Sequence, residues 1–271
     1  MTDFQEVAYE AKDYIATITL NRPDRLNAAT DRMQSEIRSA MERARDDESV
    51  RLIILTGAGR GFCAGAEMAD LQVLPSDDIK RLDVTRPFDM NARSDYQTRF
   101  SYFPAINKPI IGAINGPCAG LGMVYAMYCD IRFAADNAVF STSFARRGLI
   151  AEHGMSWMLP LIVGHANAME ILVSARKFDA QEALRMNFVS KLFPQGQFME
   201  AVRAYATDLV QNVSPRSMNV IKKQLYGVPY QTLAEAILSA NIEMFASTES
   251  DDFKEGVAHF VEKRQARFTG R

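Results

Sequence analysis

Two glycine- and alanine-rich turns set the fold prediction for this chain: GRGFCAGAEM at residues 59–68 and INGPCAGLGMVYAMYCD at residues 114–130. Each turn follows a short apolar run, LIILT at 52–56 and IIGAI at 110–114, which is typical of a strand buried on both faces. Each turn then leads into an apparent helix. Because the first amides of a helix are open donors at the positive end of its dipole, two such turns can aim N–H groups at one anionic oxygen.

The N-terminal two thirds of the chain alternates between strand and helix patterns, which predicts an α/β fold. YIATITL at 14–20 predicts a strand closed by a turn, and residues 30–45 carry apolar side chains at helical spacing. After Pro194 the strand patterns stop. Four amphipathic helices are expected there, at 197–211, 215–226, 233–247 and 252–265. We therefore expect a core over 1–195, a helical C-terminal region over 196–271, and a polar, irregular insertion at 74–99.

Composition favours a globular protein and argues against several partners. Of 271 residues 48% are hydrophobic, and 31 Lys and Arg against 33 Asp and Glu give a net charge of -2. No stretch is basic enough for a nucleic-acid surface, and no apolar run approaches the roughly 20 residues of a membrane span. The three cysteines lack CxxC spacing, and the N-terminus lacks a signal-peptide pattern. These features predict buried free thiols and a cytoplasmic protein.

Other catalytic constellations find little support in the sequence. The run at 57–62 has Phe62 where a dinucleotide-binding GxGxxG needs its last glycine. No histidine pairs obviously with Ser141 or Ser143, as a serine hydrolase would require. The three histidines show no ligand spacing, so we expect no metal. Tyr125 and Tyr128 are expected to fill the core and pocket walls.

Several segments, in the same order, resemble the crotonase or enoyl-CoA hydratase/isomerase superfamily from about Val7 to the C-terminus. They are ITLNRPDRLNA (18–28), VRLIILTGAGRGFCAGAEM (50–68), KPIIGAINGPCAGLG (108–122), CDIRFA (129–134), VGHANAMEILVSARKFDAQEALRMNFVSKLFP (163–194) and FVEKRQARF (260–268). The resemblance implies a spiral of ββα units, C-terminal trimerisation helices, and a homotrimer or dimer of trimers. It also implies an acyl-CoA thioester substrate, so coenzyme A belongs to the substrate and no separate cofactor is expected.

The resemblance places the two oxyanion-binding N–H groups on Ala66 and Leu121. Leu121 stands where the family usually has glycine, but a backbone N–H donates under any side chain except proline, so the leucine only narrows the pocket. The implied coenzyme A contacts, some reaching over from an adjacent subunit, are Arg25, Ala64, Ala66, Met68, Phe260 and Lys263. Taken alone, Arg25 and Lys263 equally fit solvated charges, and Phe260 fits a helix-packing ring. Lys108, Arg146 and Arg147 are either coenzyme A contacts or surface charges.

The chain departs from the hydratase pattern at its two catalytic acids. The matching positions hold Val124 and Phe144, and neither side chain can transfer a proton. One carboxylate remains in this neighbourhood, Glu152, at a position where the resemblance implies a Glu or Asp in members that shift double bonds. The alternative is a loop carboxylate that caps a helix beginning near Gly154. His153 either tunes this carboxylate, binds a polar substrate tail, or is structural.

The resemblance, with Glu152 as the carboxylate that remains in this neighbourhood, implies an enoyl-CoA isomerase in which Glu152 is the single base. An apolar wall would raise the pKa of Glu152 and strengthen it as a base. The predicted substrate pocket comprises Val124, Phe144, Leu149, His153 and Trp157. Two alternatives stay open: an enoyl-CoA hydratase in which Glu152 alone activates water, and a non-catalytic oligomer that binds acyl-CoA.

Overall fold

The computed structural model describes residues 4–67, 88 and 91–271, so Met68 and residues 74–87, 89 and 90 of the predicted insertion lie outside the described residues. The strands are β1 (Val7–Lys12), β2 (Ile15–Leu20), β3 (Leu52–Gly57), β4 (Ile110–Ile114), β5 (Cys118–Ala119), β6 (Ile131–Ala135), β7 (Val139–Ser141), β8 (Phe178–Asp179) and β9 (Lys191–Phe193). The helices are α1 (Asp31–Asp46), α3 (Leu121–Tyr128), α4 (Met155–Val163), α5 (His165–Ser174), α6 (Ala180–Arg185), α7 (Phe198–Asn212), α8 (Pro215–Gly227), α9 (Leu233–Glu249) and α10 (Asp251–Glu262). The predicted α/β class is confirmed.

Two sheets form the core of the described chain. The larger has the order β1-β2-β3-β4-β6-β9, antiparallel between β1 and β2 and parallel elsewhere, and the smaller has the order β5-β7-β8. β3 is buried along its whole length. Ile53 and Leu55 join the apolar cluster that includes α1 and α3, whereas Leu52 and Ile54 join the cluster with α7. Successive side chains thus enter opposite layers, which is why both strands before the turns are apolar without alternation.

Helix α1 lies on the first layer and follows the predicted helical spacing. The Thr30 hydroxyl caps the helix by accepting the Met33 N–H at 3.0 Å. At the other end the Lys108 ammonium donates to the carbonyls of Ala44 and Asp47, at 2.7 and 2.6 Å. A cation there satisfies open carbonyls at the negative end of the helix dipole. Lys108 therefore has a structural place at the end of α1.

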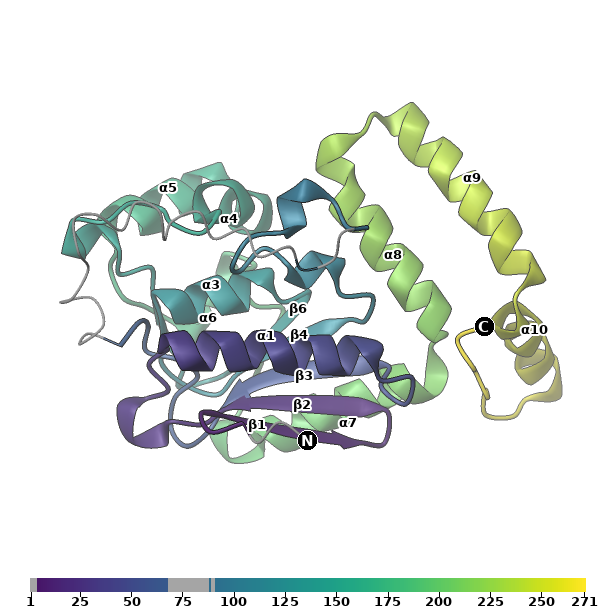
Figure 1. Cartoon of the computed structure of the whole chain (residues 1–271), viewed down its shortest axis with the longest axis horizontal. Coiled ribbons are helices and arrows are strands. Elements are labelled where there is room, and N and C mark those ends of the chain that lie inside the picture. Colours follow the sequence, from purple (N-terminus) through teal and green to yellow (C-terminus); the bar gives the residue numbers. More distant parts are fainter. Residues whose placement is uncertain (1–3, 68–87, 89–90) are drawn as a thin grey trace.

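The C-terminal region divides into a helix on the sheet and an extended arm. α7 buries Phe198, Val202, Ala206 and Val210 against the second layer. α8, α9 and α10 continue as an arm at one end of the molecule, opposite the N-terminal turn at 23–25 (Figure 1). The division into 1–195 and 196–271 stays a prediction, and α7 belongs with the sheet by its contacts. Among the described helices none has the length and apolar character to cross a membrane.

Candidate active site

The two glycine-rich turns lie against each other and share backbone hydrogen bonds. The N–H groups of Phe62 and Cys63 both donate to the Pro117 carbonyl at 3.1 Å, and the Ala119 N–H donates to the Cys63 carbonyl at 2.9 Å. A β-carbon added at Gly122, the second residue of α3, would stand 2.2 Å from the Cys63 carbonyl oxygen. The absence of a side chain at Gly122 thus lets the start of α3 touch the first turn.

Gly122→Ala should push the two turns apart. Alanine is normally preferred over glycine inside a helix, by about 1 kcal/mol. A loss of folding stability in this variant would therefore come from the clash of the new β-carbon with a backbone oxygen. We expect a destabilisation of about 1–3 kcal/mol, measured by urea denaturation, together with a clear fall in activity. Gly196→Ala is the matched control, because no atom lies within 4 Å of the added carbon. Equal behaviour of the two variants would contradict the close approach.

Two N–H groups stay open where the turns meet. In the described residues, neither the Ala66 N–H nor the Leu121 N–H donates to a backbone carbonyl. Leu121 is the first residue of α3, where no carbonyl of the helix lies in reach. Gly65 and Gly120, the residues just before them, have φ of +114° and +50°, and a β-carbon added at Gly120 would stand 3.5 Å from the Gly65 Cα. Open donors on two touching turns can together bind an oxygen that gains negative charge.

Two buried asparagines, which the sequence analysis missed, hold the first turn in shape. The Asn27 amide donates to the carbonyls of Ala58 and Gly61, at 3.0 and 2.8 Å. The Asn115 amide donates to the carbonyls of Gly57 and Gly59, at 2.9 and 3.0 Å. Asn115 directly follows an apolar strand, which is a sequence signal, whereas Asn27 has none. The two amides satisfy carbonyls at the end of β3 and in the turn that follows it.

One face of α3 leads from the open Leu121 amide to the loop that carries Glu152. Leu121, Val124 and Tyr128 are three and four residues apart and so share this face. At its far end the Tyr128 hydroxyl donates to the His153 carbonyl at 2.9 Å. A β-carbon on Gly154 would stand 2.6 Å from that hydroxyl, and Gly154 has a φ of +74°. The hydroxyl of Tyr128 therefore fixes the backbone next to Glu152.

Glu152 and His153 are partly buried neighbours. Burial raises the pKa of Glu152 above its ordinary value. Burial, with help from the Arg99 cation, lowers the pKa of His153 to about 4. The His153 ring packs on Phe100 with centroids 4.4 Å apart. Although His153 Nε2 lies 3.6 Å from Glu152 Oε2, the imidazole is neutral near pH 7, so this contact is not an ion pair.

The depressed pKa of His153 should make folding stability depend on pH. Between about pH 4 and 6.5 the unfolded imidazole binds a proton that the folded one does not, so stability falls as the pH falls through this window. The slope approaches about 1.4 kcal/mol per pH unit. Glu152 has a raised pKa, so its ionisation changes folding stability with pH in the opposite direction. The effect of His153 is therefore isolated by comparing His153→Gln with wild type in urea denaturation at several pH values. The exposed His165→Gln is the control, and an unchanged slope in His153→Gln would contradict the expectation.

The other predicted pocket residues are only partly brought together. Val124 and Phe144 are buried, and the Phe144 ring lies 6.4 Å from the His153 ring. Leu149 is partly exposed, and Trp157, 44% exposed, stacks on Tyr230 and lines a cavity beside α8. In the described residues no hydrogen bond joins the Glu152 carboxylate to the first turn of α4, whose N-cap is Gly154. The structure thus gives no support to the helix-capping alternative.

The predicted coenzyme A contacts are spread along the molecule. Arg25 is 61% exposed and pairs with Glu67, whose pKa the Arg25 and Arg22 guanidinium groups hold at about 2. The Ala64 N–H donates to the Leu26 carbonyl at 3.0 Å. Phe260 and Lys263 are exposed at the end of the α10 arm, far from the turn at 23–25 (Figure 1). Within one chain these two residues do not join the others.

The chain matches known proteins over almost its whole length. Residues 10–271 match the family model described as enoyl-CoA hydratase/isomerase. A Rhodobacter capsulatus protein named probable enoyl-CoA hydratase is 34% identical over 268 residues, which is 99% of each chain. The 1,2-epoxyphenylacetyl-CoA isomerase of Escherichia coli is 31% identical over 258 residues, 95% of each chain. The crystal structure of a probable enoyl-CoA hydratase/isomerase from Mycobacterium abscessus superposes with a TM-score of 0.86 at 28% identity, covering 98% of this chain and 99% of that one.

Proposed function

Because the chain belongs to the enoyl-CoA hydratase/isomerase family, we propose that it moves a double bond in an enoyl-CoA with Glu152 as its single base. The carboxylate takes a proton from C2 of a 3-enoyl thioester and returns it at C4. The double bond then lies between C2 and C3, conjugated with the thioester carbonyl, and no atom is gained or lost. One carboxylate can serve both steps because the same proton leaves and returns.

The dienolate formed between the two proton transfers carries its charge on the thioester oxygen. In the proposed complex this oxygen accepts hydrogen bonds from the Ala66 and Leu121 N–H groups, which donate to no backbone carbonyl in the described residues. Loss of one such donor typically costs about 3 kcal/mol of barrier. Both donors are main-chain groups, so the side chains at these positions affect the shape of the pocket more than its charge.

The observation that carries this proposal is the combination of buried apolar side chains with a single partly buried carboxyl at the Glu152 loop. Val124 and Phe144, at the two positions that the resemblance assigns to the hydratase acids, are buried hydrocarbon side chains, and Glu152 is a partly buried carboxyl with a raised pKa. The Tyr128 hydroxyl ties this loop to the same α3 face that begins at Leu121. A partly desolvated carboxylate is a stronger base than one in water, which favours removal of a carbon-bound proton.

The activity should rise with pH as Glu152 ionises. Since the carboxylate form is the base and burial raises its pKa, kcat/KM for a 3-enoyl-CoA should have an acid limb whose midpoint lies above 4.5. Initial rates followed by ultraviolet absorbance from acid to neutral pH measure this limb. A midpoint at or below 4.5 would mean that the working base is not a buried carboxyl.

Hydration is the second candidate, favoured by the name of the R. capsulatus relative. In that reaction Glu152 alone would activate a water that adds to a 2-enoyl-CoA. A third possibility is an oligomer that binds acyl-CoA without turnover. The measurement that separates them gives the protein a 3-enoyl-CoA and, separately, a 2-enoyl-CoA. Conjugation of the 3-enoyl-CoA without a change of mass supports isomerisation. A gain of one water by the 2-enoyl-CoA supports hydration. If neither substrate reacts, both enzymatic proposals are contradicted.

The proposal extends to the oligomeric state of the protein. We propose a homotrimer or a dimer of trimers in which Phe260 and Lys263 reach the coenzyme A bound to a neighbour, near Arg25 and Ala64. The exposed apolar side chains on the arm support a protein interface. They include Ile237, Leu238, Ile242 and Phe245 on α9. Sedimentation equilibrium tests the assembly.

The three buried free thiols support a reducing, cytoplasmic location.

A further inference from the structure

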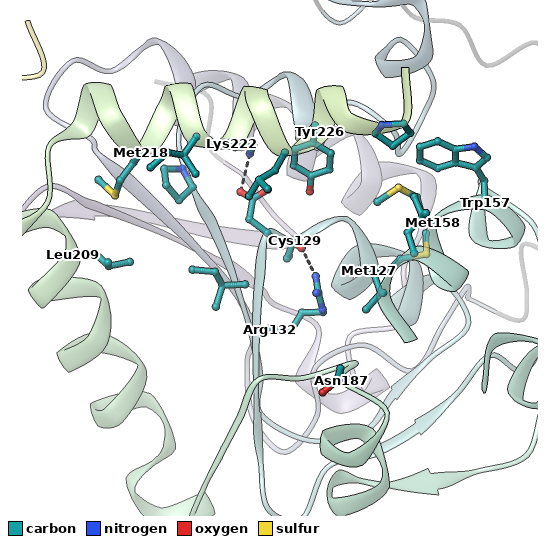
Figure 2. Close-up of a pocket in the computed structure, with 18 of the residues that line it drawn as sticks. Met127, Cys129, Arg132, Trp157, Met158, Asn187, Leu209, Met218, Lys222 and Tyr226 are labelled. Atoms are coloured by element: carbon teal, nitrogen blue, oxygen red, sulfur yellow. Dashed lines mark hydrogen bonds and ion pairs between the residues drawn. The ribbon is translucent and has the colours of Figure 1, made fainter. Parts of the chain in front are cut away.

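A cavity of about 620 Å³ lies between α8, α4, α7 and the start of β6 (Figure 2). Most of its wall is apolar, with Met158 and Leu161 from α4 and Met218, Ile221 and Leu225 from α8. The Glu152 loop does not contribute to its lining. Small-molecule sites typically enclose about 300–1,000 Å³ and combine apolar walls with few polar groups. The cavity therefore has the size and the surface of a ligand site.

Two of the three charged side chains in the lining neutralise each other. The Lys222 ammonium donates to Asp130 Oδ2 at 2.8 Å and to the carbonyls of Phe103 and Lys108, both at 3.1 Å. These bonds use all three N–H groups of the ammonium. Figure 2 shows the Lys222 side chain directed at its carboxylate partner. The ammonium therefore has no N–H left for a ligand, whereas the second carboxylate oxygen, Asp130 Oδ1, is buried without a hydrogen-bond partner in the described residues.

The third charge, on Arg132, interacts electrostatically with the Asp130 carboxylate but forms no ion pair of its own in the described residues. Its guanidinium donates from Nε to the Phe188 carbonyl at 2.6 Å. From Nη1 it donates to the Cys129 carbonyl (Figure 2). Across the described residues no carboxylate bonds to it. Burial lowers its pKa, which reflects the cost of holding the charge there. The lining thus carries two cations and one anion, and its excess positive charge sits on a planar group with further N–H donors.

We propose that this cavity binds an apolar molecule bearing one carboxylate, with the carboxylate on Arg132 and the apolar body along α8 and α4. A guanidinium matches a carboxylate through two parallel hydrogen bonds, and the pairing would neutralise the excess charge. The apolar wall would cover a hydrocarbon chain or ring without polar demands. This inference does not depend on the proposed isomerase reaction, because neither the Glu152 loop nor the open amides take part.

The chain contains its own reporter for this cavity. Trp157 is the single tryptophan of the sequence, lines the cavity and stacks on Tyr230 with ring centroids 5.8 Å apart. Tryptophan fluorescence of the whole protein is titrated with octanoate, octanol and octylammonium, which share a chain and differ in charge. We expect saturable binding of octanoate at least about tenfold tighter than octanol, with octylammonium weakest. Octanol binding as tightly as octanoate would overturn the proposal.

Arg132→Met tests the assigned cation. It should abolish the preference for octanoate over octanol, while Arg185→Met, which removes an exposed cation on α6, should keep it. If Arg132→Met does not fold, Arg132→Lys keeps a charge without the planar fork and should weaken octanoate binding several-fold. A preference that survives the loss of Arg132 would overturn the proposal. So would displacement of octanoate by octanoyl-CoA, which would assign the cavity to the acyl site.

Absence of any fluorescence response would also overturn it. In that case a second copy of the chain is the remaining occupant, because Trp157, Leu161, Ile221 and Leu225 are all exposed apolar side chains. Sedimentation of wild type and of a Leu225→Glu variant then distinguishes an interface from an empty cavity. A shift of the variant towards monomer would identify the interface.

Discussion

Glu152→Gln should lower isomerisation of a 3-enoyl-CoA by about 10²- to 10⁴-fold, the range typical of a lost general base. The amide keeps the size and the hydrogen-bonding reach of the carboxylate but cannot accept a carbon-bound proton. Because the open amides of Ala66 and Leu121 are main-chain groups, binding of the thioester should persist. The loss should therefore appear in kcat with little change in KM. Stopped assays with mass detection of the product measure both.

The matched control is Glu200→Gln, which removes an exposed carboxylate from the first turn of α7. It should turn over substrate at the wild-type rate. Folding of Glu152→Gln is checked by urea denaturation. It should be at least as stable as wild type at neutral pH, since a partly buried charge is replaced by a neutral group. Full activity in Glu152→Gln would show that another residue is the base and would contradict the mechanism with Glu152 as the single carboxylate.

The architecture was predictable because its signals are local. β3 and β4 are continuous apolar runs, and both are buried along their length in a parallel sheet. The turns were predictable for a related reason: glycine tolerates positive φ and close backbone contact, and Gly65, Gly120 and Gly122 use one or both. The family resemblance over several ordered segments then identified the crotonase-like fold, which the structural comparison confirms.

The support of the candidate site was not predictable, since its contacts join residues far apart in sequence. Tyr128 is a core residue as the sequence predicts, but its spacing gives no sign that its hydroxyl fixes the loop 25 residues later. Asn27 reaches a carbonyl 34 residues away. The sequence predicts that Trp157 belongs to the wall around Glu152, whereas in the structure it lines the cavity beside α8. The spacing of apolar residues indicates which face of a helix or strand is buried. It does not indicate which residues pack against that face.

Lys222→Met should cost about 3–5 kcal/mol of stability, the largest expected structural effect in this chain. Lys222 is 4% exposed and its Asp130 partner 14%, so the substitution leaves a largely buried carboxylate without its cation, although the Ile110 N–H still donates to it. Asp130 precedes β6 and Lys222 lies on α8, so the pair fastens the C-terminal arm to the start of β6. Urea denaturation at fixed protein concentration measures the loss.

Two further variants decide whether the charge pair is the cause. Lys223→Met, one residue along α8, removes an exposed ammonium and should change stability by less than about 0.5 kcal/mol. Adding Asp130→Asn to Lys222→Met removes the stranded charge and should recover part of the loss, because most of the cost of breaking a buried pair is the unpaired partner. If the double variant is as unstable as the sum of the two single variants, the ammonium acts through its bonds to Phe103 and Lys108 instead.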